Sequence, residues 1–131
     1  MERNEKTRAL LAAFGCALAY LLAGKVLTAV LPQVPEEAAR MWAFVHRCAA
    51  APIVEELVFR GIIQQLARPL GERQAVALQA VLFAVQHRGP AGMAYALVCG
   101  LVLGTLRSRT GSVWPGMLLH TLNNLLVFAA G

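Results

Sequence analysis

Aspartate is missing from this chain, and the other residues that usually carry hydrolytic chemistry are scarce. Without any aspartate, a membrane protease that pairs two aspartates is excluded. The only serines, Ser108 and Ser112, stand in one short turn without a GxSxG motif, so a serine nucleophile lacks its usual setting. The helix-borne zinc motif HExxH is absent as well.

Cysteine is also sparse, and its pattern indicates packing rather than chemistry. Cys16, Cys48 and Cys99 are isolated in apolar surroundings, and no CxxC motif occurs. An odd number of cysteines cannot all pair within one chain. We therefore interpret them as small buried hydrophobic residues.

Charged residues are few, and apolar residues are abundant. Charged side chains make up 15% of the 131 residues and apolar ones 58%, with a mean hydropathy of +0.58. Soluble domains carry about a quarter charged residues. The composition therefore predicts an integral membrane protein with the lipid bilayer as its surroundings, built as a single membrane domain over residues 1–131. The net charge of +5 is scattered and lacks aromatic interleaving, so no nucleic-acid partner is expected.

Five apolar runs separated by short polar turns predict the fold. The runs cover residues 9–31, about 42–67, 74–87, 91–106 and 113–130. They lack the alternation of membrane strands, so we expect an all-α, polytopic membrane bundle of about five transmembrane helices around a polar cavity. Residues 1–40 would form an N-terminal helix plus a loop. The third and fourth runs are shorter than the roughly 20 residues of a full span, which suits either tilted helices or helices that end inside the protein beside a wet cavity.

The basic residues predict the orientation in the membrane. With the N-terminus in the cytoplasm, seven basic residues lie in inner loops and two in outer loops. The inner ones are Arg3, Lys6, Arg8, Arg68, Arg73, Arg107 and Arg109, and the outer ones are Arg40 and Arg88. Separately, the GxxxG spacing of Gly100 and Gly104 predicts that the fourth run packs closely against another helix.

Polar groups interrupt three of the apolar runs. The second run carries the pair Glu55–Glu56 with Arg60. Glu56 and Arg60 are four residues apart, so they share a helix face and can pair, whereas Glu55 points about 100° away. A charged side chain at bilayer depth costs about 2.5–3.5 kcal/mol on insertion scales, so such residues indicate a functional site.

The other two polar groups are the segment from Phe83 to His87 and the pair His120 and Asn124. With antiparallel neighbours, a rise of about 1.5 Å per residue brings these side chains and Glu55 to a similar depth. Each of these polar residues, considered alone, has an ordinary structural explanation, such as a hydrogen-bonded core histidine or an interhelical amide. Their shared depth favours one common site.

The chemistry that these groups predict is hydrolysis by an activated water molecule. Glu55 would be the general base, and His87 would hold the water. His120 and Asn124 would donate hydrogen bonds to a developing oxyanion. This interpretation needs no cofactor and no metal. An alternative places a zinc or iron ion between Glu55, His87 and His120, as in a metal-dependent membrane hydrolase.

At these residues the sequence resembles the CPBP family of intramembrane glutamic proteases, which includes the type II CAAX-processing endopeptidases. Three family motifs occur in order: EExxxR from Glu55 to Arg60, FxxxH from Phe83 to His87, and HxxxN from His120 to Asn124. The resemblance covers residues 51–127, the CPBP-like catalytic core. It implies that Glu55 and His87 activate the water and that His120 and Asn124 form the oxyanion site.

The resemblance also implies supporting roles and a setting. Glu56 and Arg60 would support the site or help to bind substrate, and the bundle would enclose a conical, water-filled cavity. Members of the family usually have about eight transmembrane helices, so this is a short member, for which we expect a homodimer or a partner subunit. We expect a microbial cell-membrane protein that cuts a peptide or a membrane-anchored protein substrate.

Two further alternatives belong to other functional classes. A non-catalytic membrane immunity or adaptor protein would have no need for His87 and Asn124 together. A channel or carrier would use charged groups at mid-depth to line an ion path. A Glu55→Gln variant discriminates the first, because only an enzyme depends on the carboxylate.

Overall fold

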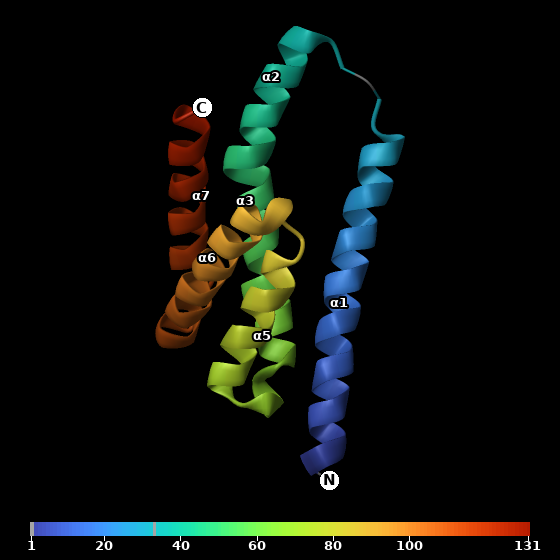
Figure 1. The fold of residues 1–131 in the computed structure, drawn as a ribbon, viewed down its shortest axis with the longest axis vertical. Helices are drawn as coiled ribbons and strands as arrows, with labels where there is room; N and C mark the ends of the chain where they lie inside the picture. Colours follow the sequence, from blue (N-terminus) through green and yellow to red (C-terminus); the bar gives the residue numbers. More distant parts are fainter. Residues whose placement is uncertain (1, 33) are drawn as a thin grey trace.

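The computed structural model describes residues 2–32 and 34–131, which form helices joined by short turns (Figure 1). Helix accounts for 88% of the chain, and no strand occurs in these two ranges. The all-α prediction is therefore confirmed. The first helix, α1 (Glu2–Val30), lies along one side of the molecule (Figure 1).

The second helical stretch is continuous and contains two π-helical segments. It consists of α2 (Glu36–Val45), η1 (His46–Ala50), α3 (Ala51–Glu55), η2 (Glu56–Ile63) and α4 (Gln64–Leu66). Both η segments are π-helical, a winding that is rare and is found mostly at functional sites. The adjacent glutamates of the sequence motif lie at the junction between α3 and η2.

Three further helices complete the bundle after a short 3₁₀ turn, η3 (Arg68–Leu70). They are α5 (Glu72–Ala84), α6 (Gly89–Thr110) and α7 (Trp114–Ala129), and α6 crosses beside the other two (Figure 1). The five helical stretches correspond to the five apolar runs of the sequence.

The end of α5 differs from the expected run, which continued to residue 87. The helix stops at Ala84, and His87 lies in the turn before α6. Here the amides of Gln86 and His87 donate to carbonyls three residues back, which tightens the chain. Gly89 then reverses its direction with a φ of 72°, a value that glycine adopts without strain. The prediction that His87 lies on a helix is wrong, because this turn follows Ala84.

Two helices in the described part of the chain, α1 and α6, are long and apolar enough to cross a membrane. The 22 residues of α6 rise about 33 Å, enough for a hydrocarbon core of about 30 Å. Only 22% of the residues in its apolar window are buried within the protein, and only 11% in that of α1. A lipid environment suits such exposed apolar faces better than water. The remaining helical stretches stay predictions as membrane spans.

The close contact between α5 and α6 depends on two glycines of α6. A Cβ atom at Gly100 would stand 2.9 Å from the Cα atom of Ala80. A Cβ atom at Gly104 would stand 2.3 Å from Nε2 of Gln79. Neither distance is tolerable, so the GxxxG prediction of close packing is confirmed, and its partner is α5. Gln79 uses this closeness to donate a 2.7 Å hydrogen bond to the carbonyl of Gly100.

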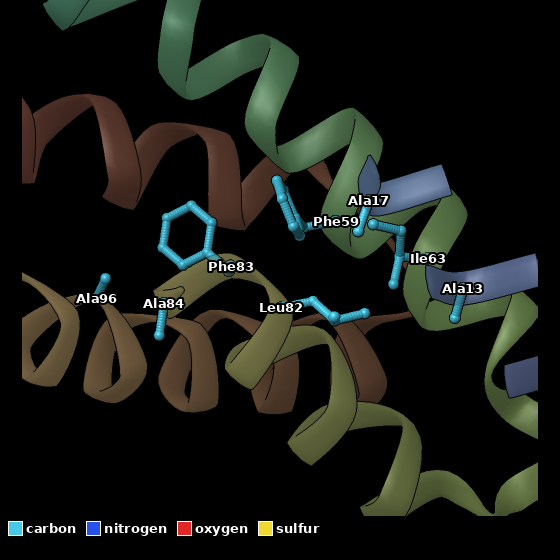
Figure 2. Close-up of a cluster of buried hydrophobic side chains, with 8 residues drawn as sticks. All are labelled: Ala13, Ala17, Phe59, Ile63, Leu82, Phe83, Ala84 and Ala96. Carbon is cyan, nitrogen blue, oxygen red and sulfur yellow. The ribbon is translucent and has the colours of Figure 1, made fainter. Parts of the chain in front are cut away.

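The apolar core lies where η2, α5 and α1 meet (Figure 2). The rings of Phe59 and Phe83 form an edge-to-face pair with centroids 5.2 Å apart. Small residues of α1, Ala13 and Ala17, close the core from its outer side (Figure 2). Phe83 is both a core residue and a neighbour of the polar groups, so the core fixes the position of the site.

Candidate active site

A chain of four charged or titratable side chains connects the second helical stretch to α7. Nδ1 of His120 lies 2.9 Å from Oε1 of Glu56, and its Nε2 lies 3.5 Å from Oε2 of Glu55. Oε1 of Glu56 also lies 3.1 Å from Nη1 of Arg60. The imidazole of His120 thus bridges both glutamates, which the sequence placed about 100° apart around the helix.

Burial separates the two glutamates. The side chains of Glu56 and Arg60 are 0% exposed, whereas that of Glu55 is 19% exposed. Glu56 therefore serves as a buried partner, and Glu55 is the carboxylate that a ligand can reach. Carboxylates behind a histidine commonly fix the orientation of its ring, which is the position that Glu56 holds toward His120.

Gly116 makes room for this buried carboxylate on α7. It lies one helical turn before His120, and a Cβ atom there would stand 2.7 Å from Oε2 of Glu56. Any larger residue would push the carboxylate away from His120. This glycine was not identified from the sequence, since a lone glycine in an apolar helix carries no distinctive pattern.

Phe83 lies among three cationic or titratable groups. The Arg60 guanidinium carbon lies 4.4 Å from the centre of its ring, a cation–π distance. The rings of His87 and His120 meet it edge-on, with centroids 4.6 Å and 5.8 Å away. The predicted supporting residues Glu56, Arg60 and Phe83 thus all pack around the histidines.

His87 is oriented by the backbone of α5. Its Nδ1 lies 2.9 Å from the carbonyl oxygen of Phe83, which can only accept, so Nδ1 carries the proton. Nε2 is then an acceptor on the far side of the ring. Although His87 lies beyond the helix, this hydrogen bond holds it one turn from Phe83.

Asn124 connects α7 to η1. Its Nδ2 donates a 2.8 Å hydrogen bond to the carbonyl of Arg47, and its own carbonyl accepts from Sγ of Cys48 at 3.9 Å. The neighbouring Asn123 accepts a hydrogen bond from the hydroxyl of Tyr95 and donates to Oδ1 of Asn124. One amide proton of Asn124 Nδ2 remains free for a ligand.

A cavity of about 770 Å³ brings the predicted residues together. Glu55, His87, His120 and Asn124 all line it, as does Phe83. Glu56 and Arg60 do not line it and lie behind His120. A volume of this size suits a ligand of drug or short-peptide dimensions.

Several polar residues that line this cavity were missed from the sequence. They are His46, Arg47, Tyr95, Cys99 and Asn123. His46 and Arg47 come before the glutamate motif and face the cavity only because the helix runs on through η1. Asn123 adjoins Asn124, and this Asn–Asn repeat is the one signal that could have revealed it.

The described side chains around the cavity do not form a set of metal ligands. Within residues 2–32 and 34–131, no three histidine, cysteine or glutamate side chains gather in a way that could hold an ion. His120 directs both ring nitrogens at carboxylates, and His87 uses Nδ1 on a carbonyl. The alternative of an ion between Glu55, His87 and His120 therefore finds no matching ligand geometry among the described residues.

Comparison with known proteins agrees with the class of protein that this fold and site define, a helical membrane protein with a polar cavity. The family model described as type II CAAX prenyl endopeptidase Rce1-like matches residues 37–126. The match covers more than half of the chain, so the chain belongs to the Rce1-like family. The resemblance to CPBP proteases noted from the motifs is thereby confirmed. No curated protein and no solved structure matches the chain.

Family membership establishes the broad function. The Rce1-like family consists of membrane-embedded proteases, whose substrates are peptides or proteins. The matched segment begins in α2 and ends in α7, so it includes every residue of the Glu55–His120 cluster.

Proposed function

We propose that the chain is a glutamic intramembrane endopeptidase, in which Glu55 and His87 activate a water molecule that attacks a peptide bond. The observation that supports this most directly is the cavity wall shared by Glu55, His87, His120 and Asn124. Glu55 is the carboxylate that reaches this cavity, and His87 has its Nε2 lone pair free. A water between them would have two acceptors for its protons.

The reaction follows from these donors and acceptors. As the water oxygen attacks the carbonyl carbon, Glu55 takes a proton and later passes it to the leaving amine. General acid–base catalysis of this kind contributes about 10²- to 10⁴-fold.

The oxyanion of that intermediate would face His120 and Asn124. His120 directs Nδ1 at Glu56 and Nε2 toward Glu55, so an Nε2–H bond beside the reacting carboxylate is the one that would turn to the oxyanion. Asn124 offers the amide proton that Arg47 leaves unused. One well-placed donor of this kind lowers the barrier by about 3 kcal/mol.

The test is a comparison of membrane peptides from cells with active protein and with variants. We expect Glu55→Gln and His87→Ala each to abolish the new peptide termini while the purified proteins keep their helical spectra. Glu36→Gln, an exposed carboxylate at the start of α2, is the matched control and should cleave normally. Undiminished cleavage by folded Glu55→Gln protein would refute the glutamic mechanism.

The same variant separates the enzyme from a non-catalytic adaptor. An adaptor acts through its surface, and the carboxylate-to-amide change leaves shape and size nearly unaltered. If cells with Glu55→Gln keep the full biological effect, the protein acts as an adaptor and that effect does not depend on proteolysis.

A further inference from the structure

A second cavity, of about 140 Å³, lies where η3 and the start of α5 meet the end of α6. It shares no lining residue with the active-site cavity. All of its lining side chains are polar. Those that matter here are Arg60, Gln64, Arg68, Glu72, Arg107 and Ser108. Since a water molecule occupies about 30 Å³ in the liquid, the cavity has room for a few waters or one small polyatomic ion.

Two of the arginines that line this cavity, Arg60 and Arg107, carry hydrogen-bond donors without partners. Arg60 is fully buried, and its Nε, Nη1 and Nη2 all lack a hydrogen-bond acceptor. Its contact with Glu56 is an ion pair without hydrogen-bond alignment. Nε of Arg107 also lacks an acceptor, whereas the one unpartnered acceptor that lines the cavity is Oε1 of Gln64. The unpartnered atoms of these residues are thus four nitrogen donors and one oxygen acceptor. A ligand with several hydrogen-bond acceptors would match them best.

The charges favour the same kind of ligand. Three guanidinium groups line the cavity against one carboxylate, Glu72. That carboxylate is already engaged, because Arg68 pairs with it at 3.3 Å and Ser108 donates to it. Guanidinium groups bind phosphate oxygens through paired N–H bonds.

The cavity is also rigid enough to be a site. Nε2 of Gln64 donates 3.0 Å hydrogen bonds both to the carbonyl of Gly104 and to Oγ of Ser108. These bonds connect α4 to α6 and fix the direction of the unpartnered Gln64 oxygen. The cavity therefore has walls held from two helices.

We propose that this cavity binds a phosphate group, supplied either by the headgroup of an anionic phospholipid or by a free phosphate compound. It opens at the end of α6, the helix whose length matches the bilayer, which is the level of lipid headgroups. Basic pockets between membrane helices at this level bind anionic headgroups. The proposal does not depend on the proteolytic mechanism.

Thermal unfolding of the purified full-length chain in zwitterionic detergent tests it. Ligands that bind the folded state raise the melting temperature in proportion to their saturation. Titrations use inorganic phosphate, phosphatidylglycerol, and phosphatidylcholine as the uncharged reference. We expect phosphate or phosphatidylglycerol to stabilise the protein, and Arg107→Gln to weaken the apparent affinity at least tenfold.

Arg109→Gln is the matched control, since it removes the same charge two residues away at an exposed position outside the cavity. Its apparent affinity should change less than twofold. If Arg107→Gln does not fold, Arg68→Gln at the exposed rim takes its place. Stabilisation by phosphatidylglycerol alone assigns the site to lipid, and stabilisation by phosphate as well assigns it to free phosphate compounds. No stabilisation by either ligand, or equal weakening in both variants, would overturn the proposal.

Discussion

At the scale of single residues, the Glu56–Arg60 pair carries a large share of both stability and site geometry. Both side chains are fully buried, and Glu56 contacts His120 as well as Arg60. Removing one member of a buried ion pair leaves an uncompensated charge and costs about 3–5 kcal/mol. The pair is therefore sensitive to single changes.

We expect Glu56→Gln to lower stability by about 3–5 kcal/mol, because Arg60 then keeps a buried charge without its carboxylate. The double variant Glu56→Gln/Arg60→Gln should recover much of this loss, as a double-mutant cycle would show. Unfolding in mixed detergent micelles provides the measurement, with Glu36→Gln as the exposed control. A single variant as stable as the wild type would contradict the assignment.

Gly116→Ala should reduce cleavage without unfolding the protein. Its Cβ atom would meet Oε2 of Glu56 at 2.7 Å, so the carboxylate and the His120 ring must move. A displacement of about 1 Å in a catalytic group can cost about 10²-fold in rate. The check is kcat/KM on any substrate peptide identified, alongside the melting temperature.

The control for this change is Gly61→Ala. There the nearest atoms would be 3.8 Å away, an ordinary packing distance, although the residue lies in η2 near the same glutamate. Its activity should stay near that of the wild type. Equal losses in both variants would show that Gly116 has no special role.

The sequence predicted most of the candidate site residues but not their contacts with one another. It singled out Glu55, His87, His120 and Asn124, which the structure places on one cavity wall. It did not place His120 between the two glutamates, because helix periodicity gives the direction of a side chain but not the neighbouring helix that meets it. Their catalytic roles stay predictions.

At the scale of helices, the junction between α5 and α6 depends on the absence of side chains at Gly100 and Gly104. Gly100→Ala should destabilise the protein by about 1–3 kcal/mol, the usual cost of overpacking. Gly92→Ala in the same helix is the control, since a Cβ atom there meets nothing within 4 Å. Melting temperatures of the two variants would settle the comparison, and an unchanged Gly100→Ala protein would contradict it.

Acid should weaken the contact between the start of α5 and the end of α6. The hydrogen bond from Ser108, and then the Arg68 guanidinium, hold the pKa of Glu72 below its ordinary value of 4.5. A lowered pKa means that the contribution is present above the ordinary value and is lost as the pH falls through the lower one. The melting-temperature difference between wild type and Glu72→Gln should therefore shrink below pH 4.5, in phosphate-free buffer.

The ends of a helix could be predicted from the sequence only where the hydropathy changes at the same residue. The run expected from residue 9 is helical from Glu2, so the helix includes polar first turns, in which Lys6 pairs with Glu2, that hydropathy does not mark. The π-helical winding of η1 and η2 leaves no hydropathy signature at all. The hydrophobic pattern predicts which residues face lipid or the core. It does not predict whether the backbone hydrogen bonds are α-helical or π-helical.

At the scale of the whole molecule, apolar side chains cover the outside, and polar ones are gathered within. Leu11, Val26, Val98 and Leu126 are examples of large apolar residues on α1, α6 and α7 that remain exposed. An outer surface of this kind requires lipid or detergent. The family match and this surface agree on a membrane location.

Five spans with a cytoplasmic N-terminus would place the C-terminus on the opposite side. We expect alkaline phosphatase fused after residue 131 to be active in a bacterial host and a fluorescent-protein fusion there to be dark, because basic loops stay inside. Fusions at the N-terminus should behave in the opposite way. Matching signals from both termini would show an even number of spans.

The π-helical segment η2 has one consequence for related chains. Its buried residues include Phe59, Arg60 and Ile63, which follow the glutamate pair. The wider π-helical turn takes up about one residue more than an α-helical turn, so a deletion of one residue within 56–63 could restore α-helical bonding and leave the later side chains in phase. We therefore expect a one-residue deletion in η2 beyond Arg60 to disturb the later helices less than the same deletion in α5, where each following side chain of the helix would turn by about 100°.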